Sequence, residues 1–484
     1  MNGVPRAQGN ARPPDAVVMK FGGTSVEDAA AIRRMVRIVQ SRGQARRAVV
    51  VSALAKVTDQ LLSAAEAAAQ GQVEYSTATL ASLKLRHQAI ASELLEASRG
   101  EFCKYLDSAF DGLTAAVCGV AAAGQLTPRA QDAIVSVGEH ISSRLAAAVL
   151  RESGVNAVHV DAAACIVTDS VHTQASPLPD VTNENLQSVI VPLLEAGAVP
   201  VLGGFIARTQ DGTPTTLGRG GSDFTAALVG AAVKAGLIEI WTDVDGIMTS
   251  DPKVCSDARR ISHMSFEEAA DLAHFGAKVL HPATLLPAMH ENIPVHVLNS
   301  RNSVGEGTQI MARVNSGSVV RAVTAKRGVA AVEVELAASA EPEGLRLVCS
   351  AFDRHHCPVE MVSASRGRVS LVVGATSALP RVAADLHGIA SVTWENHKAL
   401  VCLVGENVRR QPGVASRVFA AVSDLEVRVV CQGGSDRTLS FLVDESKAEE
   451  SVRRLHAVFF SDRKQPVSAK LNSAALCQAG ETWR

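Results

Sequence analysis

Between positions 16 and 312, short apolar runs rich in valine and isoleucine alternate with longer stretches whose apolar positions recur every three or four residues. The short runs predict buried strands at 16–19, 48–52, 199–202, 238–241 and 293–297. The longer stretches predict helices at 27–42, 129–151, 223–235 and 266–278, with a further helical segment rich in alanine, leucine and glutamine at 60–130. Strands and helices that alternate in this way predict a largely parallel sheet with helices on both faces.

The pattern changes after 315–318, an Asn-Ser-Gly-Ser segment that predicts a linker. Two stretches of about 70 residues then show a similar order of elements, which predicts a pair of ferredoxin-like βαββαβ units. The first opens at 345–349, where a helix or a short strand is expected, and continues through strands at 358–362 and 369–373. The second has strands at 399–405, 427–430 and 439–443 and helices at 414–422 and 448–459.

These patterns predict four parts of the chain. A disordered tail is expected at 1–15, an α/β domain at 16–312, and the two small units at 320–395 and 396–464, with a frayed end beyond position 461. A chain of 484 residues is long enough for two or three domains, and 47% of its residues are hydrophobic.

Charge and cysteine content exclude several classes of protein. The formal net charge of −2 argues against non-specific binding of nucleic acid. The nine cysteines are scattered and form no CxxC pair, so neither a disulfide framework nor a zinc site is expected and a reducing cytoplasm fits. No apolar run approaches the roughly 20 residues that span a bilayer, and positions 1–14 lack the apolar core of a signal peptide.

The segment with the most chemical character is TLGRGGSD at 216–223, which runs directly into a predicted helix. Backbone NH groups of a glycine-rich turn can surround an anion, and a helix N-terminus favours negative charge. Arg219 offers a planar fork for a carboxylate or phosphate. Ser222 and Asp223 are good N-cap residues, and Asp223 could also hold Mg²⁺ or orient a nucleophile. A flexible glycine loop with an ordinary N-cap is the alternative.

A second glycine-rich segment, KFGGTSV at 20–26, follows the first predicted strand. Lys20 stands at the carboxyl end of that strand, where open α/β sheets place ligands. It would stabilise charge on a transferring phosphoryl group beside Gly22 and Gly23, unless it is an ordinary exposed lysine next to a turn. The chain has no GxxxxGK[ST] motif and is therefore not a P-loop enzyme. The two glycine-rich segments together suggest phosphoryl transfer.

Other polar residues carry a weaker signal. Glu139 lies in a helical pattern, where a solvated surface glutamate is the favoured interpretation from the residues alone. His140 and His281 are expected to be structural. Asp243 and Asp245, after the strand at 238–241, fit either a ribose contact or simple turn chemistry.

Four segments taken together resemble the aspartate kinase family. They are KFGGTSV at 20–26, TTLGRGGSD at 215–223, WTDVDGIMTSDP at 241–252 and FGAKVLHPAT at 275–284. The resemblance runs from about residue 16 to residue 462, and the C-terminal pair of units resembles tandem ACT domains. It is closest to the monofunctional, lysine-sensitive type, because no homoserine dehydrogenase follows the ACT pair. It implies an amino-acid-kinase-like three-layer α/β sandwich with a mainly parallel sheet, followed by two ferredoxin-like ACT domains.

The resemblance also implies roles for the matching residues. Lys20, Gly22 and Gly23 would hold and neutralise the transferring phosphate, and Asp223 would organise the transfer centre. Aspartate would be bound by Thr58, Glu139, Arg219 and Ser222, with Glu139 facing its ammonium group and Arg219 its α-carboxylate. ATP would be held by Lys20, Thr242, Asp243, Met248, Lys253 and Lys278. Mg²⁺ would bridge the ATP phosphates rather than occupy a protein metal site.

The activity that the resemblance implies is ATP-dependent phosphorylation of the β-carboxylate of L-aspartate to 4-phospho-L-aspartate, the first step of lysine, threonine and methionine biosynthesis. A cytoplasmic homodimer or larger assembly is expected, with no nucleic-acid or membrane partner. Another amino-acid kinase, for example one acting on glutamate, and a non-catalytic ACT-based amino-acid sensor are the alternatives. Intact Lys20, Arg219 and Asp223 argue against the sensor.

Some positions depart from the family pattern. Met248 stands where many relatives carry tyrosine, and Lys253 replaces a common arginine. In the first ACT unit, Arg366 follows Glu360 at a position where lysine-controlled relatives tend to carry an acid. A positive charge there predicts that lysine inhibits weakly or that another amino acid is the effector.

Overall fold

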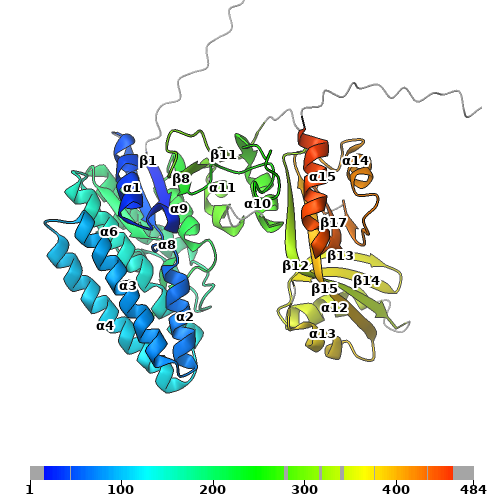
Figure 1. The fold of residues 1–484 in the computed structure, drawn as a ribbon, viewed down its shortest axis with the longest axis horizontal. Helices are drawn as coiled ribbons and strands as arrows, with labels where there is room; N and C mark the ends of the chain where they lie inside the picture. Colours follow the sequence, from blue (N-terminus) through cyan, green and yellow to red (C-terminus); the bar gives the residue numbers. More distant parts are fainter. Residues whose placement is uncertain are drawn as a thin grey trace, which may run out of the picture.

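The computed structural model of the chain describes residues 16–43, 45–276, 282–314, 319–337, 343–374, 376–432 and 434–461. Figure 1 shows two bodies side by side: an N-terminal body, blue to green, and a C-terminal body, yellow to red. The predicted tail at 1–15, the predicted linker at 315–318 and the end beyond 461 lie outside the described residues.

The N-terminal body is built around an eight-stranded sheet with the strand order β3-β5-β2-β1-β8-β10-β11-β9. Neighbouring strands run parallel except for β10 and β11. The strands are β1 (Ala16–Phe21), β2 (Arg46–Val51), β3 (Ala157–Val160), β5 (Val199–Gly203), β8 (Leu237–Thr242), β9 (His263–Ser265), β10 (Val295–Asn299) and β11 (Thr308–Met311).

Helices cover both faces of this sheet because its strands are apolar on both sides. In β1, Val17 and Met19 belong to one buried cluster and Val18 to the other. The first face is covered by α1 (Ala29–Ser41), α2 (Val57–Ala69), α3 (Val73–Leu94), α4 (Arg99–Ala123), α5 (Pro128–Val135) and α6 (Val137–Glu152). The second is covered by α7 (Ala162–Cys165), α8 (Pro179–Glu195), α9 (Gly221–Ala232), α10 (Phe266–His274) and α11 (Leu286–His290). The three-layer fold with a mainly parallel sheet is confirmed.

Some predicted elements have different bounds in the structure. The single helix expected at 129–151 is two helices, α5 and α6, which meet at Ser136. The strand expected at 293–297 begins only at Val295, since Pro294 has no NH group to donate to the ladder. The helix expected at 266–278 ends at His274, and positions 277 and 278 lie outside the described residues.

Two helical stretches, Arg99–Ala123 and Pro128–Glu152, are long and apolar enough to cross a bilayer by length and composition alone. Both supply side chains to the core on the α1 side of the sheet, Phe102 from α4 and Ile134 from α5. The apolar stretch of Pro128–Glu152 is 78% buried, so packing within this body accounts for its apolar character. The apolar stretch of Arg99–Ala123 is only 28% buried, and packing accounts for a smaller part of it.

A small sheet with the order β4-β6-β7 lies beside the main one. Its strands are β4 (Val167–Thr168), β6 (Ile206–Thr209) and β7 (Pro214–Thr216). Strand β7 leads directly into the glycine-rich segment 217–220, which is followed by α9. This small sheet therefore holds the N-terminal end of the glycine-rich segment 217–220 in place.

The C-terminal body is a six-stranded antiparallel sheet with the order β13-β14-β12-β15-β17-β16. Its strands are β12 (Ala322–Leu336), β13 (Val359–Ser365), β14 (Arg368–Gly374), β15 (Ala390–Val404), β16 (Val430–Cys431) and β17 (Thr438–Asp444). Its helices are α12 (Gly344–Arg354), α13 (Leu379–Asp385), α14 (Val414–Ala421) and α15 (Ala448–Phe460). Short 3₁₀ turns complete the described elements of the chain: η1 (Gly23–Ser25), η2 (Pro282–Leu285) and η4 (Glu445–Lys447).

Strand β12 contributes to two separate cores of the C-terminal body. Val323, in its first half, packs in a cluster with Val401 and α15, whereas Val332, in its second half, packs with Leu371 and α12. The segment at 345–349, left open between helix and strand, is part of α12. The strand expected at 427–430 is reduced to Val430 and Cys431.

Candidate active site

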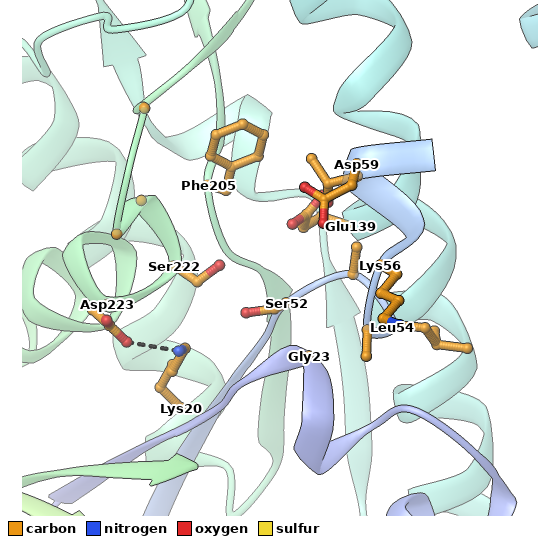
Figure 2. Close-up of a pocket in the computed structure, with 16 residues that line it drawn as sticks. Lys20, Gly23, Ser52, Leu54, Lys56, Asp59, Glu139, Phe205, Ser222 and Asp223 are labelled. Carbon is orange, nitrogen blue, oxygen red and sulfur yellow. Dashed lines mark ion pairs between the residues drawn. The ribbon is translucent and has the colours of Figure 1, made fainter. Parts of the chain in front are cut away.

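A cavity of about 300 Å³ lies at the carboxyl ends of β1, β2 and β5. Six residues that were predicted from the sequence to belong to the site line it: Lys20, Gly23, Thr58, Glu139, Ser222 and Asp223. They come from four separate parts of the chain: β1 with the turn η1, and the helices α2, α6 and α9. Figure 2 shows Lys20 and Asp223 at one end of the cavity and Glu139 at the other, with Ser52 and Ser222 between them.

Lys20 and Asp223 form an ion pair with 2.7 Å between Nζ and Oδ1, drawn as a dashed line in Figure 2. Both side chains are largely buried, with 11% and 12% of their surface exposed. Lys20 is held by the central strand β1, and Asp223 by the first turn of α9. When a phosphate and its counter-ion bind, the lysine can pair with the phosphate and the aspartate with the counter-ion.

The glycine-rich segment places the N-terminus of α9 at the cavity. Gly220 is the N-cap and has φ of +76°, a left-handed backbone that glycine adopts without steric cost. Gly218, Gly220 and Gly221 all line the cavity together with Ser222. Because a helix N-terminus carries partial positive charge, this end of the cavity favours an anion.

Glu139, in the first turn of α6, is buried inside the wall of the cavity with 3% of its surface exposed. Burial raises the pKa of its carboxyl group to about 8, although the backbone of Ala53 and the charge of Lys20 act in the opposite direction. Its Oε2 atom is buried without a hydrogen-bond partner. Such an acceptor is costly unless a ligand supplies a donor. The solvated glutamate favoured from the residues alone is therefore wrong.

Two predicted residues of the site lie next to the cavity rather than in its wall. Arg219 belongs to the glycine-rich segment, but it is exposed and is not among the described residues that line the cavity. Gly22 lies behind Lys20, where its NH group donates to the carbonyl of Trp241 over 3.0 Å. A side chain at this position would meet Lys20 Nζ at 3.5 Å.

The residues predicted to hold ATP lie further along the same edge of the sheet. Thr242 ends β8, the strand next to β1, and Asp243 follows it, so both are adjacent to the Lys20 end of the cavity. Met248 is half-buried and forms a bridge with Arg260, and Lys253 is exposed in the loop that follows. None of these four lines the cavity among the described residues, and Lys278 lies outside them.

Metal binding by the protein alone is not favoured. The described residues contain no group of three His, Cys, Asp or Glu side chains that could hold an ion. Asp223 is nevertheless a carboxylate at the anion-binding end of the cavity. Mg²⁺ is commonly bound through one or two carboxylates together with substrate phosphates, so Asp223 fits a nucleotide-bound ion.

Several residues of the cavity were missed from the sequence. They are Ser52, Ala53, Leu54, Ala55, Lys56 and Asp59, which follow β2, and Phe205, which follows β5. The backbones of Lys56 and Phe205 both have φ of +68°, a region that bulky residues rarely adopt. Positive φ values cannot be read from local sequence. Half of the residues at 52–59 are apolar, so only their place directly after a buried strand could have marked them.

Models of known families match two parts of the chain. The amino acid kinase family matches residues 15–299, and an ACT domain matches residues 401–459. The chain is 34% identical to the lysine-sensitive aspartokinase 3 of Escherichia coli (strain K12) over 461 residues, which cover 92% of this chain and 99% of that protein.

Solved structures agree with these matches. The fold is similar to that of E. coli aspartokinase III in complex with aspartate and ADP (R-state), with a TM-score of 0.84 and 34% identity over 92% of this chain and all of that one. With the same enzyme in complex with lysine and aspartate (T-state), the TM-score is 0.74 at the same identity and coverage. The backbone is thus closer to the first of these two. From its kinase fold, its C-terminal ACT match and its similarity to aspartokinases along nearly all of their length, the chain belongs to the aspartokinases of the amino acid kinase family.

Proposed function

We propose that this chain transfers the γ-phosphoryl group of ATP to the β-carboxylate of L-aspartate, giving 4-phospho-L-aspartate and ADP. The observation that carries the proposal is the composition of one cavity. Its Lys20–Asp223 end favours a phosphate, and its Glu139 end presents a buried acceptor without a partner. A substrate that has both a carboxylate and an ammonium group satisfies both ends.

The site must bring two anions together rather than activate a weak nucleophile. A carboxylate is already ionised at neutral pH, so the reaction needs positioning and charge neutralisation more than a strong base. Lys20 and the backbone at the start of α9 provide positive charge where the phosphoryl group would lie. Mg²⁺, when bound with ATP, would neutralise further charge on the phosphates, and we assign Asp223 as the carboxylate that would hold it.

Recognition of the amino group is assigned to Glu139. In the empty cavity its raised pKa favours the neutral carboxylic acid at neutral pH. A substrate ammonium beside it favours the carboxylate, because an opposite charge within a few ångströms lowers a carboxyl pKa. Binding of aspartate should therefore release a proton. Thr58 and Ser222 supply hydroxyl groups in the same cavity, and we assign Arg219 to the α-carboxylate.

ATP is assigned to the edge of the sheet beside Lys20. Lys20 stands on β1, between the cavity and the end of β8, where Thr242 and Asp243 lie. A triphosphate lying along this edge would reach the cavity with its terminal phosphate. Met248, Lys253 and Lys278 are proposed as further nucleotide contacts on the basis of the family motifs alone.

We further propose that residues 16–312 form the catalytic unit and that the C-terminal body binds an amino-acid effector. This activity would be the first step of lysine, threonine and methionine biosynthesis. We place it in the cytoplasm, because the described cysteines are all free thiols, which a reducing compartment maintains.

We propose a homodimer or larger assembly. The edge strands β13 and β16 expose Val362 and Val430, to 48% and 43% of their surface, and unpaired edges of this kind favour association. Light scattering should give a multiple of the chain mass, and a monomer would contradict this part of the proposal.

A trapping assay with hydroxylamine tests the reaction, because hydroxylamine converts the acyl phosphate product to a hydroxamate, which forms a coloured complex with added iron(III). ATP-dependent product is expected with L-aspartate and little with L-glutamate or with no amino acid. A preference for glutamate would reassign the chain to another amino-acid kinase. No product with either substrate, from a folded protein that binds an amino acid, would favour the non-catalytic sensor.

A further inference from the structure

Asp132, in α5, is a fully buried carboxylate that none of the predicted roles uses. Its Oδ1 accepts a hydrogen bond from the hydroxyl group of Thr216 over 2.6 Å, and Nδ1 of His172 lies 2.8 Å from its Oδ2. The backbone NH of Thr173 lies 3.1 and 3.0 Å from the two oxygens. Burying a carboxylate is costly without such donors, so this cluster holds three segments of the chain together.

The donors come from segments that form the catalytic cavity. Thr216 is the last residue of β7, directly before the glycine-rich segment. Thr173 has φ of +72°, a strained backbone for a β-branched residue. Its carbonyl oxygen faces Gly218, where an added Cβ would lie 3.1 Å away. Gly218 itself has φ of +70°. The bonds to Asp132 therefore hold both the start of the glycine-rich segment and the loop packed against it.

Asp132 is also connected to the opposite wall of the cavity. Helix α5 leads through Ser136 into α6, where Glu139 lies in the first turn. The NH group of Ser136 donates to the carbonyl of Asp132 over 3.1 Å, so the two helices are joined by helical hydrogen bonding. One buried side chain thus links the element that holds Glu139 to the segment that ends in Asp223.

We propose that Asp132 is a positioning residue for phosphoryl transfer, which sets the spacing between Glu139 and the glycine-rich segment 217–220 with the start of α9 that follows it. The inference rests on the proposed function, because that function requires the two ends of the cavity to hold one substrate at a fixed separation. Small displacements of such groups are expensive: a shift of about 1 Å can reduce the rate by about a hundredfold.

Thr216→Val tests the link with little change of shape, because it removes the hydroxyl group and leaves His172 and Thr173 on Asp132. Thr215→Val is the matched control. Thr215 is the neighbouring residue on β7, fully buried, and its hydroxyl lies 2.7 Å from that of Thr168, away from Asp132. Each variant deletes one buried hydroxyl–oxygen contact from the same strand.

Thr216→Val is expected to lower kcat/KM for aspartate by roughly tenfold to a hundredfold, as misplaced reacting groups do, with little change in the KM for ATP. Thr216→Ser should restore the wild-type value. Thr215→Val should lower the thermal unfolding midpoint by a similar amount and leave kcat/KM nearly unchanged.

Equal losses of kcat/KM in Thr216→Val and Thr215→Val would show that Asp132 acts only through stability and would overturn the inference. So would a Thr216→Val enzyme with unchanged kinetics. A wild-type chain that does not phosphorylate aspartate would instead overturn the proposed function, and the assignment of Asp132 with it.

Discussion

At the residue scale, the Lys20–Asp223 pair is the part of the site most directly tied to phosphoryl transfer. Lys20→Met should lower kcat by a factor of about 10²–10³, which is the usual effect of removing one preorganised hydrogen-bond donor from such a site. Lys104→Met is the control, because Lys104 is exposed on α4 and does not line the cavity. It should keep most of the activity. A Lys20→Met enzyme that retains more than about a tenth of wild-type turnover, with an unchanged unfolding midpoint, would exclude this role.

The buried Glu139 carboxyl group makes stability depend on pH in a defined direction. Its pKa is raised from 4.5 to about 8 in the folded protein. Between these two values the folded state holds a proton that the unfolded state has released, so the contribution of this group to stability falls as the pH rises. Glu139→Gln, which cannot ionise, should remove that part of the pH dependence. Urea unfolding of both proteins at several pH values between 5 and 9 measures it, and parallel pH profiles would contradict the assignment.

The residues at the Lys20–Asp223 end of the cavity could be predicted from local sequence, whereas Glu139 at the other end could not. Lys20, Ser222 and Asp223 stand in glycine-rich segments whose local composition already indicates an anion site. Glu139 gave no such signal, since its burial depends on the packing of α6 against residues that follow β2. Arg219 was expected in the cavity and is exposed, because the direction of a side chain in a glycine turn is not determined by its neighbours in the sequence.

At the element scale, the alternation of strands and helices was sufficient to predict the parallel sheet but not its strand order. Strand β1 pairs with β2, which follows it in the chain, and also with β8, where Val17 lies opposite Leu237, more than 200 positions away. Local patterns do not report the second pairing. Strand β12 (Ala322–Leu336) was not predicted from the sequence, and only tertiary packing assigns Val323 and Val332 to different cores.

Helix α15 contacts the segment predicted to hold ATP. Nε2 of the buried His456 lies 2.9 Å from the hydroxyl of Thr249, and the NH of Val323 donates to the Thr249 carbonyl over 2.8 Å. Cys255, in the same segment, is part of the core formed by α15. The C-terminal body therefore supports the loop between Met248 and Lys253.

His456→Leu should raise the KM for ATP several-fold and leave the KM for aspartate unchanged, since it loosens the loop without touching the cavity. Ser451→Ala is the control: Ser451 is equally buried on α15, but its hydroxyl donates to the carbonyl of Lys447 within the helix. Steady-state kinetics with each substrate varied would decide the matter, and an equal rise in both KM values would argue for general loosening instead.

At the scale of the whole molecule, Glu360 joins the two bodies. Its carboxylate lies 2.7 Å from Nζ of Lys326 and 3.2 Å from Nε2 of His274, which is at the end of α10 in the N-terminal body. Burial alone would raise the pKa of Glu360, but the hydrogen bonds from His274 and Lys326 outweigh it and lower the pKa. Lys326 already compensates the charge of this carboxylate, although its buried Oε2 atom has no hydrogen-bond partner of good geometry.

Lysine is therefore expected to inhibit this enzyme only weakly, since Glu360 is already paired and the exposed Arg366 adds positive charge at the adjacent turn. Arg366→Glu should increase the sensitivity to lysine, whereas Arg381→Glu, on α13, should not. Initial rates at subsaturating aspartate with lysine, threonine or methionine give the comparison. Half-inhibition of the wild-type enzyme by submillimolar lysine would contradict the prediction.

The central claim is that the Glu139 end of the cavity binds the amino group of the molecule whose carboxylate is phosphorylated at the Lys20 end. A two-substrate kinetic matrix for wild type and Glu139→Gln tests it most directly. We predict a large rise in the KM for aspartate with an unchanged KM for ATP, because only the ammonium receptor is removed. A rise mainly in the KM for ATP, or no change in either, would contradict the account.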